Sequence, residues 1–185
     1  MRESEPVALL REVEGVEIPA GTRSMLPAGA HVLVTQTLGG NYTVMTVDGA
    51  LYRVDKKDAD ALGHEVQAAD PRLAAPAAGG APVDEALVWD QLRTVYDPEI
   101  PVNIVDLGLV YRLDIVPLPT GGHRVAVEMT MTAPGCGMGE FLKADAEEKL
   151  YAVPGVREVN VEIVWEPAWD RDRMSEAAKL QLGMM

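Results

Sequence analysis

Hydrophobic and polar positions alternate through much of the first third of the chain. Residues 31–37 alternate as a strand, and residues 42–47 and 50–54 form a hairpin across Asp48-Gly49, a favoured two-residue turn. No helical period interrupts these segments. The pattern predicts a small β-rich, barrel-like domain or meander within residues 1–63.

A short helix and a linker are predicted next. Asp55 is a suitable N-cap for a helix that runs to Leu62, and Gly63 follows as a stop signal. Residues 64–82 are rich in Ala, Pro and Gly and have no amphipathic period. Because prolines break helices, this segment is interpreted as a linker rather than a helix.

The remaining residues, 83–185, predict a second domain of mixed structure. A helical face begins after an N-cap at Asp84 and continues through Tyr96, where the prolines that follow end it. Further predicted elements are strands at 109–115 and 125–131, a helix at 138–151 and a strand at 159–165. The order predicts an α+β class: an α-β-β-α-β helix-on-sheet domain whose first two strands are antiparallel. A C-terminal tail helix is expected from about residue 173 to 182.

Composition narrows the class of protein. The chain has 185 residues, of which 48% are hydrophobic, enough for one domain or two small ones. A single cysteine excludes an intrachain disulfide framework and fits a reducing compartment. With no apolar run of about 20 residues and no signal-peptide pattern, we expect a cytoplasmic protein without membrane association. A net charge of −13 without a basic stripe argues against a nucleic-acid partner.

Familiar catalytic and metal-binding patterns do not occur in this sequence. The three histidines, His31, His64 and His123, share no metal-ligand spacing. No Ser-His-Asp or Cys-His arrangement and no glycine-rich phosphate loop is recognised. Candidate chemistry therefore rests on the cysteine and the polar residues around it.

Cys136 is predicted to lie on a strand-to-helix turn, with a glycine on each side. The N–H groups and dipole of a helix N-terminus favour a thiolate there. Glu140, in the first turn of the same helix, opposes that effect by raising the pKa of a nearby thiol. The alternative is that Cys136 is a small buried hydrophobic residue.

Polar residues near the predicted strand ends are the other candidates. The hydroxyls of Thr130 and Thr132 could hydrogen-bond a thiolate or an anionic ligand, although such residues are often exposed β-formers. Asp97 and Asp106 could place carboxylates there. Alternatively, Asp97 ends a helix and Asp106 bonds its own turn.

Three segments carry a family resemblance. Residues 97–111, 132–136 and 165–183 are similar, in that order, to the motifs of the metal–sulfur cluster biosynthesis family, which includes the PaaD-like proteins. The resemblance covers about residues 84–183. Residues 38–40 and 57–63 resemble an N-terminal extension found in one subgroup of that family.

The resemblance implies an accessory factor in iron–sulfur cluster assembly or protein maturation, and not an enzyme. It implies that Cys136 is the cluster or iron ligand, with Asp106 and Thr132, which match motif positions, beside it. The cargo would be a transient iron–sulfur cluster or iron. The implied partners are the assembly machinery and client apoproteins.

Chemistry limits how one chain could hold a cluster. A cluster usually needs four ligands, mostly thiolates. This chain supplies one thiolate and a homodimer would supply two, so transient transfer fits better than storage.

Two other functions remain open. The chain could be an iron-free adaptor that docks clients through its acidic faces and through Trp165 and Trp169, with Cys136 structural. The two tryptophans could equally pack the tail onto the sheet. A redox enzyme that uses Cys136 as a nucleophile is disfavoured, because no resolving cysteine and no paired base is present.

Overall fold

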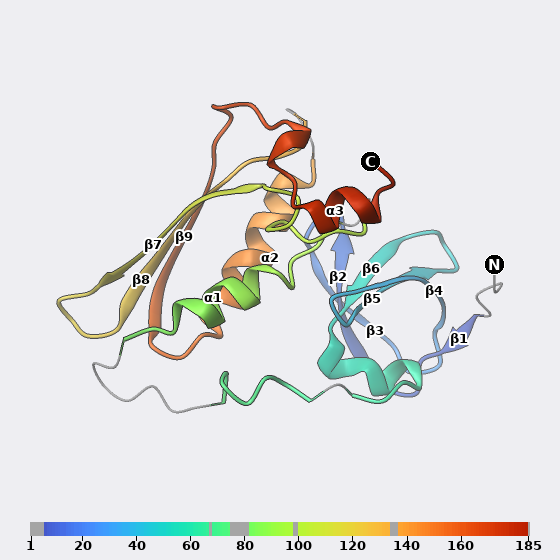
Figure 1. The fold of residues 1–185 in the computed structure, drawn as a ribbon. Coiled ribbons are helices and arrows are strands. Elements are labelled where there is room, and N and C mark those ends of the chain that lie inside the picture. The colour runs from blue at the N-terminus through green and yellow to red at the C-terminus, as the bar shows by residue number, and fades with distance from the viewer. Residues whose placement is uncertain (1–5, 67, 75–81, 98–99, 134–136, 185) are drawn as a thin grey trace. The chain divides into compact units, whose positions relative to one another are not determined.

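A computed structural model describes residues 6–66, 68–74, 82–97, 100–133 and 137–184 of the chain. It divides the chain into two units, Met1–Ala69 and Asp70–Met185. Each unit has its own sheet, and the two are described separately (Figure 1).

The first unit is a six-stranded antiparallel sheet. Its strands are β1 (Val7–Ala8), β2 (Val13–Ile18), β3 (Arg23–Leu26), β4 (His31–Leu38), β5 (Asn41–Thr46) and β6 (Leu51–Val54), in the spatial order β1-β4-β5-β6-β2-β3. The predicted meander is present as β4-β5-β6. The sheet is not closed into a barrel within the described residues, because β1 and β3 are its two edges.

Two local predictions for this unit need correction. The β5–β6 hairpin has a three-residue loop instead of a two-residue one: the Thr46 N–H donates to the Ala50 carbonyl (2.9 Å), and Gly49 takes φ +87° as the last loop residue. The helix after Asp55 is a 3₁₀ helix, η1 (Lys56–Leu62), without a side-chain cap bond. Gly63 ends it with φ +76°, as predicted.

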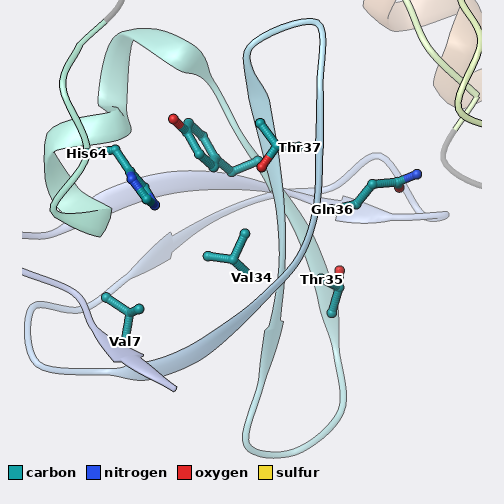
Figure 2. Close-up of a pocket in the computed structure, with 7 residues that line it drawn as sticks. Val7, Val34, Thr35, Gln36, Thr37 and His64 are labelled. Carbon is teal, nitrogen blue, oxygen red and sulfur yellow. The ribbon is translucent and has the colours of Figure 1, made fainter. Parts of the chain in front are cut away.

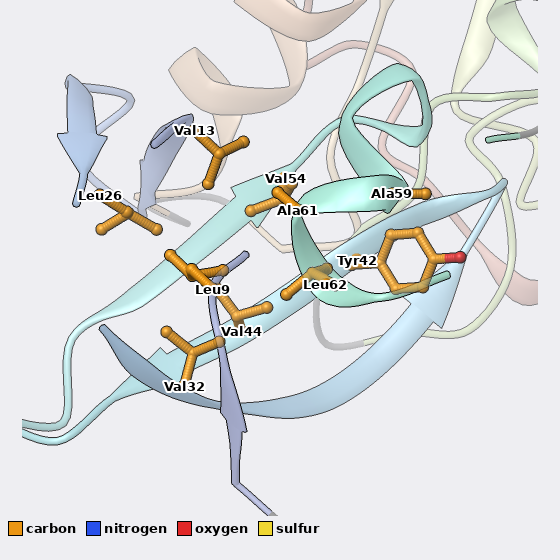
Figure 3. Packing of buried hydrophobic residues seen from close by; sticks show 10 residues of the cluster. All are labelled: Leu9, Val13, Leu26, Val32, Tyr42, Val44, Val54, Ala59, Ala61 and Leu62. Carbon is orange, nitrogen blue, oxygen red and sulfur yellow. The ribbon is translucent and has the colours of Figure 1, made fainter. Parts of the chain in front are cut away.

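The core of the first unit lies between the sheet and η1. Ten buried residues form it, and Figure 3 shows the η1 side chains facing those of the strands: Leu9, Val13, Leu26, Val32, Tyr42, Val44, Val54, Ala59, Ala61 and Leu62. Arg11 adds a polar connection, because its guanidinium donates to both carboxylate oxygens of Asp60 (2.7 Å each) and to Asp58 (2.8 Å). The hydrogen bond from Arg11 is the main cause that lowers the pKa of Asp60.

The second unit has a three-stranded sheet with helices on one face (Figure 1). Its elements are α1 (Glu85–Leu92), β7 (Val110–Pro117), β8 (His123–Met129), α2 (Gly139–Tyr151), β9 (Val156–Ile163), the 3₁₀ turn η2 (Arg171–Arg173) and α3 (Glu176–Gln181). Strands β7 and β8 are antiparallel, as predicted. Strand β9 runs parallel to β8, because α2 forms the crossover between them. The mixed α+β class with a helix-on-sheet part is confirmed.

Helix α1 ends at Leu92, four residues before the predicted Tyr96. The Val95 N–H donates to the Leu92 carbonyl (3.1 Å) instead of the Gln91 carbonyl that a continuing helix would use, and the Val95 carbonyl accepts from the Ile104 N–H (3.0 Å). Tyr96 then forms a bridge with Asn103. A contact with a later segment thus replaces the last helical turn.

Boundaries elsewhere in the second unit also differ from the prediction. Strand β9 lies at Val156–Ile163 instead of residues 159–165. The tail helix is shorter than expected and begins after Ser175, whose Oγ accepts from the Ala178 N–H (3.2 Å).

Part of the segment predicted as a linker makes specific contacts with α1. Arg72 donates to Asp70 (2.6 Å) and to Asp90 of α1 (2.7 Å), so this stretch is tied to the helix. Within the described part of the chain, the helices are too short or too polar to cross a membrane.

Candidate functional site

A turn within the first motif, at residues 103–106, is organised by Asn103. Its side-chain oxygen accepts from the N–H groups of Val105 (3.1 Å) and Asp106 (2.9 Å), and its Nδ2 donates to the Asp106 carboxylate (2.6 Å). Asn103 is buried, while Asp106 is half-buried. The carboxylate of Asp106 is therefore held by its own turn and remains partly open to solvent.

The C-terminal tail crosses this turn. The Ser175 N–H donates to the Asp106 carbonyl (2.8 Å), and Trp169 Nε1 donates to the Leu107 carbonyl (2.8 Å). Gly108 sits under the tail with φ +71°, and a Cβ there would overlap the Arg173 carbonyl. The first and third motifs, about sixty residues apart, thus meet at one place.

A second set of contacts fixes the same tail to β7. The Tyr111 hydroxyl donates to the Pro167 carbonyl (2.8 Å), and the Arg173 guanidinium lies 4.3 Å above the centre of the Tyr111 ring. The two motif tryptophans differ: Trp169 is half-buried and hydrogen-bonded, while Trp165 is 48% exposed. Of the two tryptophans, only Trp169 packs the tail as the alternative interpretation expected.

The end of β8 adjoins the turn from the other side. The Thr130 N–H donates to the Leu109 carbonyl (2.8 Å), and Met129, Thr130 and Met131 are all buried. Thr130 is thus not an exposed β-former. Thr132 follows two residues later and is half-buried.

Cys136 and its two preceding residues lie outside the described residues. On the far side of them α2 begins at Gly139, close to the predicted residue 138. Gly139 packs tightly, since a Cβ at this position would lie 3.1 Å from Ile163 of β9. The structure therefore joins the turn of Asp106 to the strand that leads to Thr132, and the position of Cys136 is not described.

Helix α2 is held against α1 by a largely buried ion pair. Lys149 Nζ lies 3.1 Å from the Asp145 carboxylate, and it donates to the Thr94 carbonyl just after α1 (2.6 Å). Both side chains are on the inner face of the helix. This contact fixes the orientation of the helix that follows the cysteine.

A resident metal site is not found in the described part of the chain. There, no three His, Cys, Asp or Glu side chains are grouped so that they could hold a metal ion. The three histidines are on β4, after η1 and on β8.

The first unit has a groove of its own, of about 550 Å³ (Figure 2). It follows β4 at residues 34–37, beyond Val32, the last β4 residue paired with β1. One wall is a stacked pair, Tyr42 and His64, with ring centres 5.1 Å apart. The described residues that line it include no carboxylate, lysine or arginine, so it offers stacking and hydrogen bonding without fixed charge.

Comparison with known proteins finds a matching family and several similar proteins. A profile described as "Iron-sulfur cluster assembly protein" matches residues 85–163. The "Fe-S protein maturation auxiliary factor" of Porphyromonas gingivalis is 47% identical over 94 residues, which are 51% of this chain and 86% of that protein. The "Fe-S protein maturation auxiliary factor SufT" of Staphylococcus aureus is 38% identical over 90 residues, 49% of this chain and 98% of that protein.

Among solved structures, a Bacillus anthracis crystal structure of a domain of unknown function, DUF59, is 39% identical. It covers 55% of this chain and 95% of that protein, with a TM-score of 0.47. These alignments leave about half of the chain without a counterpart in the proteins named here.

Proposed function

Because this chain belongs to the iron–sulfur cluster assembly protein family, we propose that it is an accessory factor that helps to insert clusters into client proteins. The membership confirms the family indicated by the three motifs, and one of its relatives carries the name SufT. The observation that carries the proposal is the 47% identity to a maturation auxiliary factor across 86% of that protein.

We assign the central role to Cys136, the only thiol in the chain. Its predicted place just before α2 favours the thiolate that iron requires. Asp106 and Thr132 are proposed to lie beside it, Asp106 as an oxygen ligand or hydrogen-bond acceptor and Thr132 as a hydroxyl donor. The half-exposed carboxylate of Asp106, fixed by Asn103, supports this assignment.

The presence of one thiol per chain also indicates whether a cluster would be stored or passed on. One chain contributes one of the roughly four ligands that a cluster needs. The remaining ligands come from a second copy, a small thiol or the client itself. The cluster therefore passes through this protein, which acts in the reducing cytoplasm without catalytic turnover.

Anaerobic reconstitution with iron and sulfide tests the proposal. Wild type should retain roughly one cluster per two chains and should activate an apo-aconitase client, whereas Cys136→Ser should do neither. Ala144→Ser is the matched control, because it adds the same hydroxyl at an exposed position of α2 and leaves the thiol intact. Full client activation by Cys136→Ser would exclude the thiol mechanism.

The assigned roles of Asp106 and Thr132 are tested in the same assay. Asp106→Asn and Thr132→Val should lower cluster retention while the second unit stays folded, as judged by tryptophan fluorescence. Unchanged retention in both variants would remove these residues from the site.

An iron-free adaptor is the second candidate. The observation that favours it is the exposed Trp165, which the packing of the tail leaves uncovered. On this alternative, client proteins should still co-purify with the chain after iron chelation and in Cys136→Ser. Loss of co-purification under both conditions would exclude it.

A further inference from the structure

Strand β9 has a free edge. The sheet order β7-β8-β9 places β9 at one side, and in the described part of the chain β8 is its sole strand partner. The Val159 N–H, which faces outward, donates to the Tyr151 hydroxyl (3.4 Å), and the outward backbone N–H and C=O groups beyond it are able to pair with a strand from another molecule. Proteins either shield such an edge against unwanted strand pairing or use it to bind a strand of a partner.

A groove of about 390 Å³ runs along this edge. It is lined by residues 160–163 of β9, by Glu140 and Lys143 of α2, and by Trp165. Successive side chains of a strand point to opposite faces. A cavity that touches four successive residues therefore follows the edge of the strand, and α2 forms its second wall.

The groove carries unpaired negative charge. Glu140 and Glu162 are exposed, and neither has an ion-pair partner among the residues that the structure describes. Trp165 is 48% exposed, and the face of an indole ring attracts a cation. Among the described residues that line it, Lys143 alone is positively charged. The groove thus favours a cationic side chain.

We propose that this groove binds an extended, lysine- or arginine-bearing segment of a client or assembly protein, which adds to β9 as a further strand. The proposal rests on the accessory function and names the chemistry of its partner. Backbone pairing would align the segment. Basic side chains on its α2 side would meet Glu140, and those on the opposite face would meet Glu162, which alternates with the inward-facing Val161 and Ile163; Trp165 adds an exposed ring just after the strand. A second copy fits poorly, because it would bring two acidic grooves together in chains of net charge −13.

Fluorescence anisotropy with labelled peptides tests the proposal on the iron-free full chain. The probe is the peptide (Lys-Val)₄, compared with (Glu-Val)₄ and with (Lys-Val)₄ methylated at alternate backbone nitrogens. The methylated peptide keeps its charge, but along one edge it has lost the backbone N–H donors that pairing with β9 requires. Only unmethylated (Lys-Val)₄ should bind well, and it should protect the outward amides of β9 from hydrogen exchange.

Paired variants separate the groove from the overall charge. Glu140→Gln with Glu162→Gln should weaken (Lys-Val)₄ binding about tenfold. Glu12→Gln with Glu65→Gln changes the net charge equally at exposed positions of the first unit and should leave Kd within about twofold. Equal weakening by both pairs would mean long-range attraction alone and would overturn the proposal.

Other outcomes also decide the matter. If the methylated peptide binds as well as (Lys-Val)₄, strand addition is refuted. If (Glu-Val)₄ binds as well, recognition of positive charge is refuted. A dimer that dissociates on Trp165→Ala, together with no peptide binding, would assign the groove to a second copy. Cys136→Ser should bind the peptide normally, so failure of the thiol mechanism and failure of the groove are distinguished.

Discussion

Gly108→Ala should detach the C-terminal tail from the turn that holds Asp106. Gly108 has φ +71°, a conformation that L side chains avoid, and a Cβ at this position would overlap the Arg173 carbonyl. Because the obstruction is backbone, a side-chain rotation cannot relieve it. The tail must move away, and its contacts with the turn are lost.

The expected loss of stability has two parts. The left-handed conformation costs an alanine about 1–2 kcal/mol. The hydrogen bonds of Ser175 and Trp169 to the turn contribute about 0.5–1.5 kcal/mol each, and the Arg173–Tyr111 contact about 0.5–1 kcal/mol. Together, Gly108→Ala should lower the free energy of unfolding by about 2.5–6 kcal/mol.

Gly121→Ala is the matched control. Gly121 lies between β7 and β8 with φ +88°, and a Cβ there meets nothing within 4 Å. This variant should therefore show the conformational cost alone, about 1–2 kcal/mol. The difference between the two variants measures the tail contacts.

Guanidinium unfolding followed by tryptophan fluorescence is a suitable assay. The three tryptophans, Trp89, Trp165 and Trp169, all lie in the second unit, so unfolding of the first unit does not contribute. Hydrogen exchange adds a local readout, because the Ser175 amide should lose protection in Gly108→Ala only. Equal destabilisation by both variants, with the Ser175 amide still protected, would refute the reasoning.

Three further predictions concern polar contacts. Asn103→Ala removes two backbone bonds and the bond to the Asp106 carboxylate, and should cost the second unit about 2–4 kcal/mol in the same unfolding assay. Lys149→Met leaves the buried carboxylate on α2 without its cation and should cost about 2–4 kcal/mol, whereas an unchanged midpoint would contradict a structural role. The pKa of Asp60 is lowered by Arg11, so the stabilisation is present above about pH 4 and is lost as pH falls through the lowered value. Arg11→Gln should reduce this acid-side loss in melts of the first unit followed by circular dichroism.

Elements with a clear local signal were predictable from the sequence. Strands β7 and β8 alternate over seven or eight residues, and α2 begins where the strand-to-helix turn predicted it. The short strands β1 and β3 have too few residues to show a period, so the pattern did not identify them. The early end of α1 coincides with the pairing of residues 95–96 with residues 103–104, which no local rule anticipates.

Some residues of the candidate site were also predictable from the sequence, and others were not. Asp106 was a candidate from its place near a predicted strand end, and the motif supported it, but Asn103, which holds it, was not singled out. The spacing Asn-x-x-Asp was the available signal, because an asparagine side chain often bonds to the backbone two or three residues ahead. The meeting of the tail with this turn joins residues about sixty positions apart, and periodicity carries no information about such contacts.

The two proposed sites of the second unit are linked through α2. The helix begins three residues after Cys136, and its second residue, Glu140, lines the groove at β9. A basic segment bound there would neutralise carboxylate charge near the turn that carries the thiol. Because thiolate-ligated clusters carry negative charge, the acidic groove alone repels such a cargo, and its occupation by a basic client segment lowers that repulsion. The same charges that select the client would then favour binding of the cluster at Cys136 when the client is bound, so that cluster and client are held on one chain before transfer.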